Sequence, residues 1–251
     1  SVVGKRDSSY FKGYGIQLNP GGYVQGIVID NNNNNSTAKA VATISLGEWH
    51  HVAMVWKEAT KEVDLYIDGV NQPLSIDNRN ATNPSNNTEP FAIGYGGTDK
   101  GNPFDGMIDD VRFWNDARTD AEIANNYQTA LLGNETNLVS YWQLNNNYQD
   151  KVSIGNHLTS YNNPSFSSTD VPFGAPAPPP TPSPNTHSLD LEYDSLQGAE
   201  IGDSTQTGLE SSGDFTVEAW VKPEQITYGT NVVVKRHGGT GKGYGLLTYP
   251  G

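Results

Sequence analysis

The sequence predicts an all-β protein built as a two-sheet antiparallel sandwich with one short helix. Trp49–Trp56 is apolar or aromatic at nearly every position, which is typical of a central strand covered on both faces. Val63–Gly69 alternates apolar and polar residues and ends in an Asp-Gly turn signal, so it predicts a half-buried partner strand. Helical spacing is convincing only in Asp116–Tyr127, where Thr119 and Glu122 form a capping-box pattern.

The remaining elements follow in order from the same criteria. Polar stretches rich in Asn, Ser and Thr, such as Asn31–Thr37 and Asn71–Glu89, predict loops between strands. Runs rich in β-branched and aromatic residues predict strands at Tyr23–Ile29, Ala38–Leu46, Phe91–Gly94, Phe104–Trp114, Leu138–Asn146, Ser188–Glu192, Asp214–Val221 and Asn231–Val234.

Three separated stretches resemble laminin-G-like modules of the concanavalin A-like lectin/glucanase superfamily. They are EWHHVAMVW with VDLYIDG in the hairpin, FDGMIDDVRFWNDARTDAEI over Phe104–Ile123, and DFTVEAWVKP over Asp214–Pro223. The resemblance implies a jelly-roll topology for the sandwich. It also implies a module that binds sugars or proteins, because the fold alone does not fix the ligand.

Composition limits the functions open to the chain of 251 residues. It has no Cys, so disulfides and thiolate metal sites are excluded, and it has no apolar run long enough for a membrane span. A net charge of −13 argues against nucleic acid and anionic membranes as partners. These features suit an extracellular or cell-surface protein, and we expect no membrane insertion.

A stretch of twenty residues occurs twice. Val2–Gly21 and Val232–Gly251 are identical at ten ungapped positions with a constant offset of 230 residues, which indicates a tandem repeat. We therefore predict that residues 1–173 are the C-terminal greater part of one module and residues 188–251 the N-terminal strands of the next. Residues 174–187 contain a Pro-rich linker, APAPPPTPSP, expected to be extended.

The repeat leads to a prediction about assembly. A single jelly roll has one position for the repeated strand, so we predict that the segment after Pro184 packs away from residues 1–173. It would then join a neighbouring copy or module, head to tail, in a filament. The predicted partners are therefore neighbouring copies of the same protein, and glycans.

Calcium is the one cofactor that the sequence favours. Asp109 and Asp110 are adjacent in a strand that, by the resemblance, lies beside the strand carrying Asp190 and Glu192. Calcium prefers such carboxylate oxygens. Because side chains alternate along a strand, we expect only one of Asp109 and Asp110 to offer its carboxylate; a salt bridge to Arg112 or a turn hydrogen bond is the alternative role.

Catalysis is not expected. The glucanases of the superfamily supply two carboxylates from one Glu-x-Asp-x-x-Glu strand. Glu62-Val63-Asp64 is followed by Ile67, and Glu192-Tyr193-Asp194 by Gln197, so both stretches lack the second Glu. For sugar binding, the sequence offers aromatic candidates, although their strand positions favour a core role: Trp56, Trp114, Trp142, Tyr95 and Tyr148.

Five Asn residues stand in glycosylation sequons within predicted loops, with ordinary turn chemistry as the alternative: Asn34, Asn35, Asn80, Asn86 and Asn134. Taken together, the sequence predicts a non-catalytic structural or adhesive repeat module of an extracellular protein. The alternative is a lectin-like carbohydrate-binding module.

Overall fold

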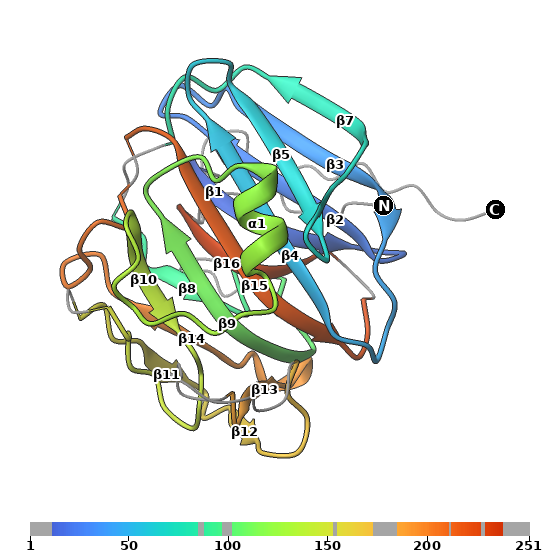
Figure 1. The fold of residues 1–251 in the computed structure, drawn as a ribbon, viewed down its shortest axis with the longest axis vertical. Coiled ribbons are helices and arrows are strands. Elements are labelled where there is room, and N and C mark those ends of the chain that lie inside the picture. Colours follow the sequence, from blue (N-terminus) through green and yellow to red (C-terminus); the bar gives the residue numbers. More distant parts are fainter. Residues whose placement is uncertain are drawn as a thin grey trace.

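The computed structural model describes residues 12–84, 88–96, 102–152, 155–172, 185–210, 212–226 and 229–237, with the side chains of 234–237 left out. These residues form two antiparallel sheets packed face to face, with one helix outside (Figure 1). This confirms the predicted jelly-roll sandwich. Nothing helical among the described residues has the length and apolar character needed to cross a bilayer.

The first sheet has eight strands. In spatial order they are β11 (Thr159–Tyr161), β14 (Gly198–Ile201), β8 (Phe91–Ile93), β16 (Thr230–His237), β1 (Lys12–Asn19), β2 (Tyr23–Ile29), β3 (Asn35–Thr43) and β7 (Leu74–Arg79). β7 lies within the stretch predicted to be a loop. It was missed because five of its six residues are exposed and it carries no regular apolar alternation.

The second sheet contains the predicted hairpin. Its order is β12 (Ser165–Ser167), β13 (Ser188–Leu191), β9 (Gly106–Trp114), β15 (Phe215–Pro223), β4 (His50–Lys57), β5 (Glu62–Ile67) and β6 (Val70–Asn71), and β10 (Leu138–Trp142) also pairs with β9. β4 is buried at its six middle positions because the first sheet covers one of its faces and the helix Asp120–Asn126 covers the other, as its apolar run predicts.

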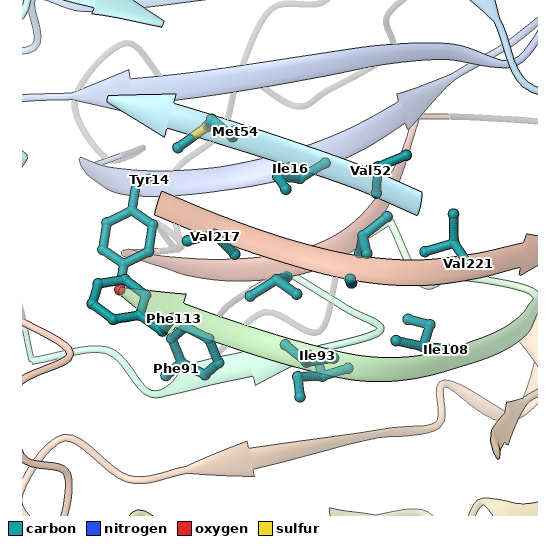
Figure 2. Packing of buried hydrophobic residues seen from close by; sticks show 14 of the residues in the cluster. Tyr14, Ile16, Val52, Met54, Phe91, Ile93, Ile108, Phe113, Val217 and Val221 are labelled. Carbon is teal, nitrogen blue, oxygen red and sulfur yellow. The ribbon is translucent and has the colours of Figure 1, made fainter. Parts of the chain in front are cut away.

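The core lies between the two sheets. Tyr14 of β1 reaches across to Phe113 and Phe215, with ring centroids 5.8 and 4.6 Å away (Figure 2). Phe91 of β8 stacks on Trp142 at 5.0 Å. The first copy of the repeated motif Lys-Gly-Tyr-Gly therefore places Tyr14 in the centre of the core, where its hydroxyl donates to the Leu209 carbonyl oxygen (2.8 Å).

The helix α1 (Asp120–Asn126) lies on the outer face of the second sheet (Figure 1). Thr119 and Glu122 form the predicted capping box, in which each side chain accepts from the other residue's backbone N–H. Ile123 packs against Ala53, Val55 and Tyr66. The outer face of β4 is thereby covered, which explains why its sequence is apolar on both faces.

The segment after the linker folds back onto its own chain, so the prediction that it packs away from residues 1–173 is wrong. β15 pairs with β4 and β9, β13 with β9, β14 with β8, and β16 with both β1 and β8. Four strands from beyond residue 184 are thus inserted inside the two sheets of residues 12–172. The reason is pairing: these strands take up the edges that residues 12–172 would otherwise expose.

The two copies of the repeat explain how this is possible. β16 contains the second copy of the strand-like residues 2–7, and it lies antiparallel to β1, with Ile16 opposite Val233. The position beside β1 is therefore taken by the second copy. Residues 2–11 of the first copy and residues 238–251 of the second copy lie outside the described residues.

Candidate functional site

A network of charged side chains is buried beneath α1. Glu218 of β15 accepts hydrogen bonds from Trp114 Nε1 (2.7 Å) and pairs with His51 Nε2 at 3.0 Å. Arg112 Nη1 lies 3.7 Å from Glu218, and both side chains are at most 3% exposed. Burial alone raises the pKa of Glu218, but His51 and Arg112 outweigh it and lower this pKa to about 2. Glu218 is therefore a buried carboxylate.

Arg112 also fastens the helix to the sheet. Its guanidinium donates to the carbonyl oxygens of Asn126 (3.1 Å) and Thr129 (2.7 Å). These carbonyls belong to the end of α1 and the turn after it, where helices leave acceptors unsatisfied. The predicted salt bridge of Arg112 to its neighbouring acid is present at 3.6 Å, with Asp110. This network is structural, because it has no opening to solvent.

Asp109 and Asp110 both turn their carboxylates toward one amide. Asn185 Nδ2 donates to Asp109 Oδ2 (2.6 Å) and Asp110 Oδ2 (3.1 Å). The expectation that only one of them offers its side chain is wrong, because a bulge interrupts β9 here and Asp110 takes a φ of +47°. Burial, and then the charge of Asp110, raises the pKa of Asp109 well above its ordinary value.

The other two predicted calcium ligands lie elsewhere. Asp190 stands opposite Met107 of β9 and accepts from Ser165 Oγ (3.2 Å), while Glu192 is exposed at the start of the 3₁₀ turn η1 (Tyr193–Ser195). Burial raises the pKa of Glu224, and the charges of Asp190 and Glu192 raise it further. Within the described ranges, no three His, Asp or Glu side chains come together in a way that could hold a metal ion. The four predicted residues therefore do not form one site.

An open polar hollow of about 760 Å³ lies at the end of the sandwich where β4 stops. Three segments distant in sequence form it: the β4–β5 turn, the loop after β7 and the residue before β15. Its lining residues are Glu58, Ala59, Lys61, Thr82, Asn83 and Asp214. Another cavity, of about 10 Å³ under β1 and β2, has room for roughly one water molecule and is too small for a ligand.

The hollow is held by its own hydrogen bonds. Asp214 Oδ1 accepts from the Glu58 backbone N–H (2.8 Å), which joins two of the three segments. Asn83 donates its amide N–H to the Thr82 carbonyl oxygen (2.7 Å) and to Glu58 Oε1. Behind them Asp30, 2% exposed, accepts from both Thr82 N (3.2 Å) and Thr82 Oγ1 (3.1 Å). The lining is therefore organised without a ligand.

The aromatic candidates for sugar binding are in the core. Trp56, Trp114, Trp142 and Tyr95 are at most 1% exposed, and Tyr148 packs partly buried against the core cluster, so the core role weighed for them is confirmed. The described sequon residues are all exposed: Asn34, Asn35, Asn80 and Asn134; Asn86 lies outside the described residues. Asn34 Nδ2 is already bonded to Asp30 Oδ2 (2.9 Å).

Neither near-match to the glucanase carboxylates is arranged for glycoside hydrolysis. Glu62 and Asp64 of β5 are paired with Arg79 and Lys57. Asp194 lies in η1, where a strand's alternation does not hold, and Glu192 is its N-cap. The geometry that the glucanases need, two carboxylates facing one cleft from one strand, is therefore formed by neither stretch.

The sandwich, its outer helix and its polar end loops define a jelly-roll module of the lectin type. Residues 1–124 match a laminin-G family model described as the concanavalin A-like lectin/glucanases superfamily, and this part of the chain belongs to that superfamily. The same two sheets continue to residue 237. Membership supports a carbohydrate-binding or adhesive module in general. No curated protein and no solved structure matches the chain.

Proposed function

We propose that this protein is an extracellular adhesive module that binds carbohydrate in the hollow at the end of the sandwich and does not cleave glycosidic bonds. The observation that carries the proposal is the preformed polar lining of that hollow. The hollow is open, so a ligand lying on this lining would keep one side in solvent. Carboxylate, amide, hydroxyl and ammonium groups converge there, and these are the partners that sugar hydroxyls need.

The charge of the lining narrows the ligand class. Glu58 and Asp214 are acidic, whereas Lys61 is the one basic residue among the described residues of the lining. Acidic sugars are therefore disfavoured, and neutral or amino sugars fit better. The β4–β5 turn carries Lys61 at a φ of +59°, so the backbone fixes where this ammonium group begins.

Asn83→Ala should abolish saturable binding of neutral or amino glycans without lowering the melting temperature. The variant removes an amide from the lining but no core contact. Binding is first surveyed on a glycan array and then measured by isothermal titration calorimetry. Asn80→Ala, in the same loop but outside the lining, is the matched control and should bind as the parent does. If no glycan binds, or Asn83→Ala binds equally well, the hollow is not a sugar site.

Calcium is proposed as a structural ion at Asp109, Asp110 and Asn185. Asn185 Oδ1 is buried and has no hydrogen-bond partner, while its Nδ2 lies between the two carboxylates. A cation between the two carboxylates would relieve their repulsion, and Asn185 Oδ1 would join them as a third ligand once the amide turned over. Calcium takes six to eight oxygens, so this set is a partial one and predicts weak binding.

Millimolar calcium should therefore raise the melting temperature by a few degrees, because an ion that binds only the native state stabilises it by about 1–3 kcal/mol at 10–100 times its Kd. Asp109→Asn should remove this response, since it deletes one of the two carboxylates. Differential scanning calorimetry in chelator and in calcium compares the two proteins. A melting temperature that is the same in both solutions would show that these residues hold no calcium.

The repeated stretch supports the placement of this module in a tandem array. The filament predicted from the sequence is not part of the proposal, because it required the segment after Pro184 to leave its own chain.

A further inference from the structure

Three side chains at the other end of β4 form a serine–histidine–aspartate relay. Ser45 Oγ lies 2.8 Å from His50 Nε2, and His50 Nδ1 lies 2.9 Å from Asp68 Oδ2. Ser45 is in the turn before β4, His50 begins β4, and Asp68 is in the turn between β5 and β6. We propose that this relay is a hydrolytic site for small acyl esters, with Ser45 as the nucleophile.

The surroundings fix the histidine tautomer that such chemistry requires. Asp68 Oδ1 accepts from the His51 backbone N–H (2.9 Å), so its other oxygen is directed at His50. Partial burial raises the pKa of Asp68, but the hydrogen bonds and charges of His50 and His51 together outweigh burial and lower this pKa. An ionised carboxylate can only accept, so His50 carries its proton on Nδ1. Its Nε2 lone pair then faces Ser45, whose backbone N–H also points to it (3.3 Å).

The reaction follows from these positions. Ser45 Oγ attacks the ester carbonyl carbon and gives its proton to His50 Nε2. The carbon–oxygen bond to the alcohol breaks, and His50 returns the proton to the leaving oxygen, which leaves an acyl-Ser45. Water then attacks the acyl carbon and loses a proton to His50. The bond to Oγ breaks, Ser45 regains the proton, and the carboxylic acid is released.

The turn leaves room for an ester. Ser45 and Leu46 are exposed, and a side chain added at Gly47 would meet no atom within 4 Å. Gly47 N–H donates to the Pro223 carbonyl oxygen (2.8 Å), which anchors the turn to β15. In the described part of the chain the Leu46 N–H donates to no protein acceptor, so it is available to an oxyanion. An open site without a deep pocket suits short acyl groups.

Glu48 competes with His50 for the one serine proton. Ser45 Oγ lies 2.6 Å from Glu48 Oε2, so the hydroxyl proton can go to either acceptor. Removing this carboxylate leaves His50 as the single acceptor. Glu48→Ala should therefore raise the hydrolytic rate, which a turn held together only by hydrogen bonds would not do.

The test uses the full chain and p-nitrophenyl acetate. Ser45→Ala should reduce ester hydrolysis to the rate without a nucleophile, and His50→Ala should lower the rate about 10²-fold, the contribution of a positioned base. Ser75→Ala is the matched control, because Ser75 is exposed and its hydroxyl bonds to the Lys39 carbonyl oxygen rather than to a histidine. A fluorophosphonate should label Ser45, as located by peptide mass. Equal rates for the parent and Ser45→Ala, or a label absent from Ser45, would show that these hydrogen bonds only stabilise the turn.

Discussion

Glu218→Ala is expected to lower the free energy of unfolding by about 3–5 kcal/mol, the cost of removing one partner from a buried ion pair. The Arg112 guanidinium would stay buried with less compensating charge, and Trp114 Nε1 and His51 Nε2 would lose their acceptor. His51 Nδ1 already has no partner, so the histidine could not re-pair. Urea unfolding followed by tryptophan fluorescence measures the loss.

The control is an exposed ion pair of the same sheet. Asp64→Ala breaks the pair with Lys57, and because both side chains are partly exposed it should cost less than about 1 kcal/mol. The pH dependence gives a second check through Glu218→Gln. The folded pKa of about 2 lies below the ordinary 4.5, so the carboxylate's contribution is complete above about pH 4.5 and is lost as pH falls towards 2. The stability difference between parent and Glu218→Gln should shrink over that range; a constant difference would contradict the pairing.

Most of the fold could be predicted from the sequence, because its signals are local. The apolar run of β4, the alternation in β5 and the capping box at Thr119 depend on neighbouring residues, and each was found in place. β7 was not predicted because an exposed edge strand needs no apolar face. The path of the chain after Pro184 was predicted wrongly. The chain holds two copies of a strand for which a single jelly roll has one position, and the pairing of β16 with β1 shows that the second copy occupies a place in this sandwich.

The candidate sites were harder to predict, because they depend on contacts between distant residues. The hollow joins Glu58, Thr82 and Asp214, and no spacing in the sequence links the three. The bulge in β9 turns Asp109 and Asp110 toward one amide, and the types of these residues do not predict it. The relay had a partial signal: the β4–β5 hairpin register sets His50 near the Asp-Gly turn, 18 residues away. The sequence gives no signal for Ser45, because its approach to His50 depends on the geometry of the turn.

A chain ending at residue 172 should fail to fold, because the segment after the linker supplies interior strands of both sheets. β15 lies between β4 and β9, and β16 between β1 and β8, so the loss of these two strands alone leaves four strand edges unpaired. It also removes Phe215, Val217 and Val233 from the centre of the core. Unpaired edges and uncovered apolar faces bind to one another, so the truncated chain should aggregate.

Three measurements check this result. The truncated chain should show no cooperative urea transition, should bind a hydrophobic dye and should elute as large species in gel filtration. A chain ending at residue 237 keeps every described strand and is the matched control; it should unfold cooperatively as a monomer. A cooperative transition in the 172-residue chain would mean that residues 12–172 form a domain without β13–β16. The second half would then be an attached segment rather than part of the sandwich.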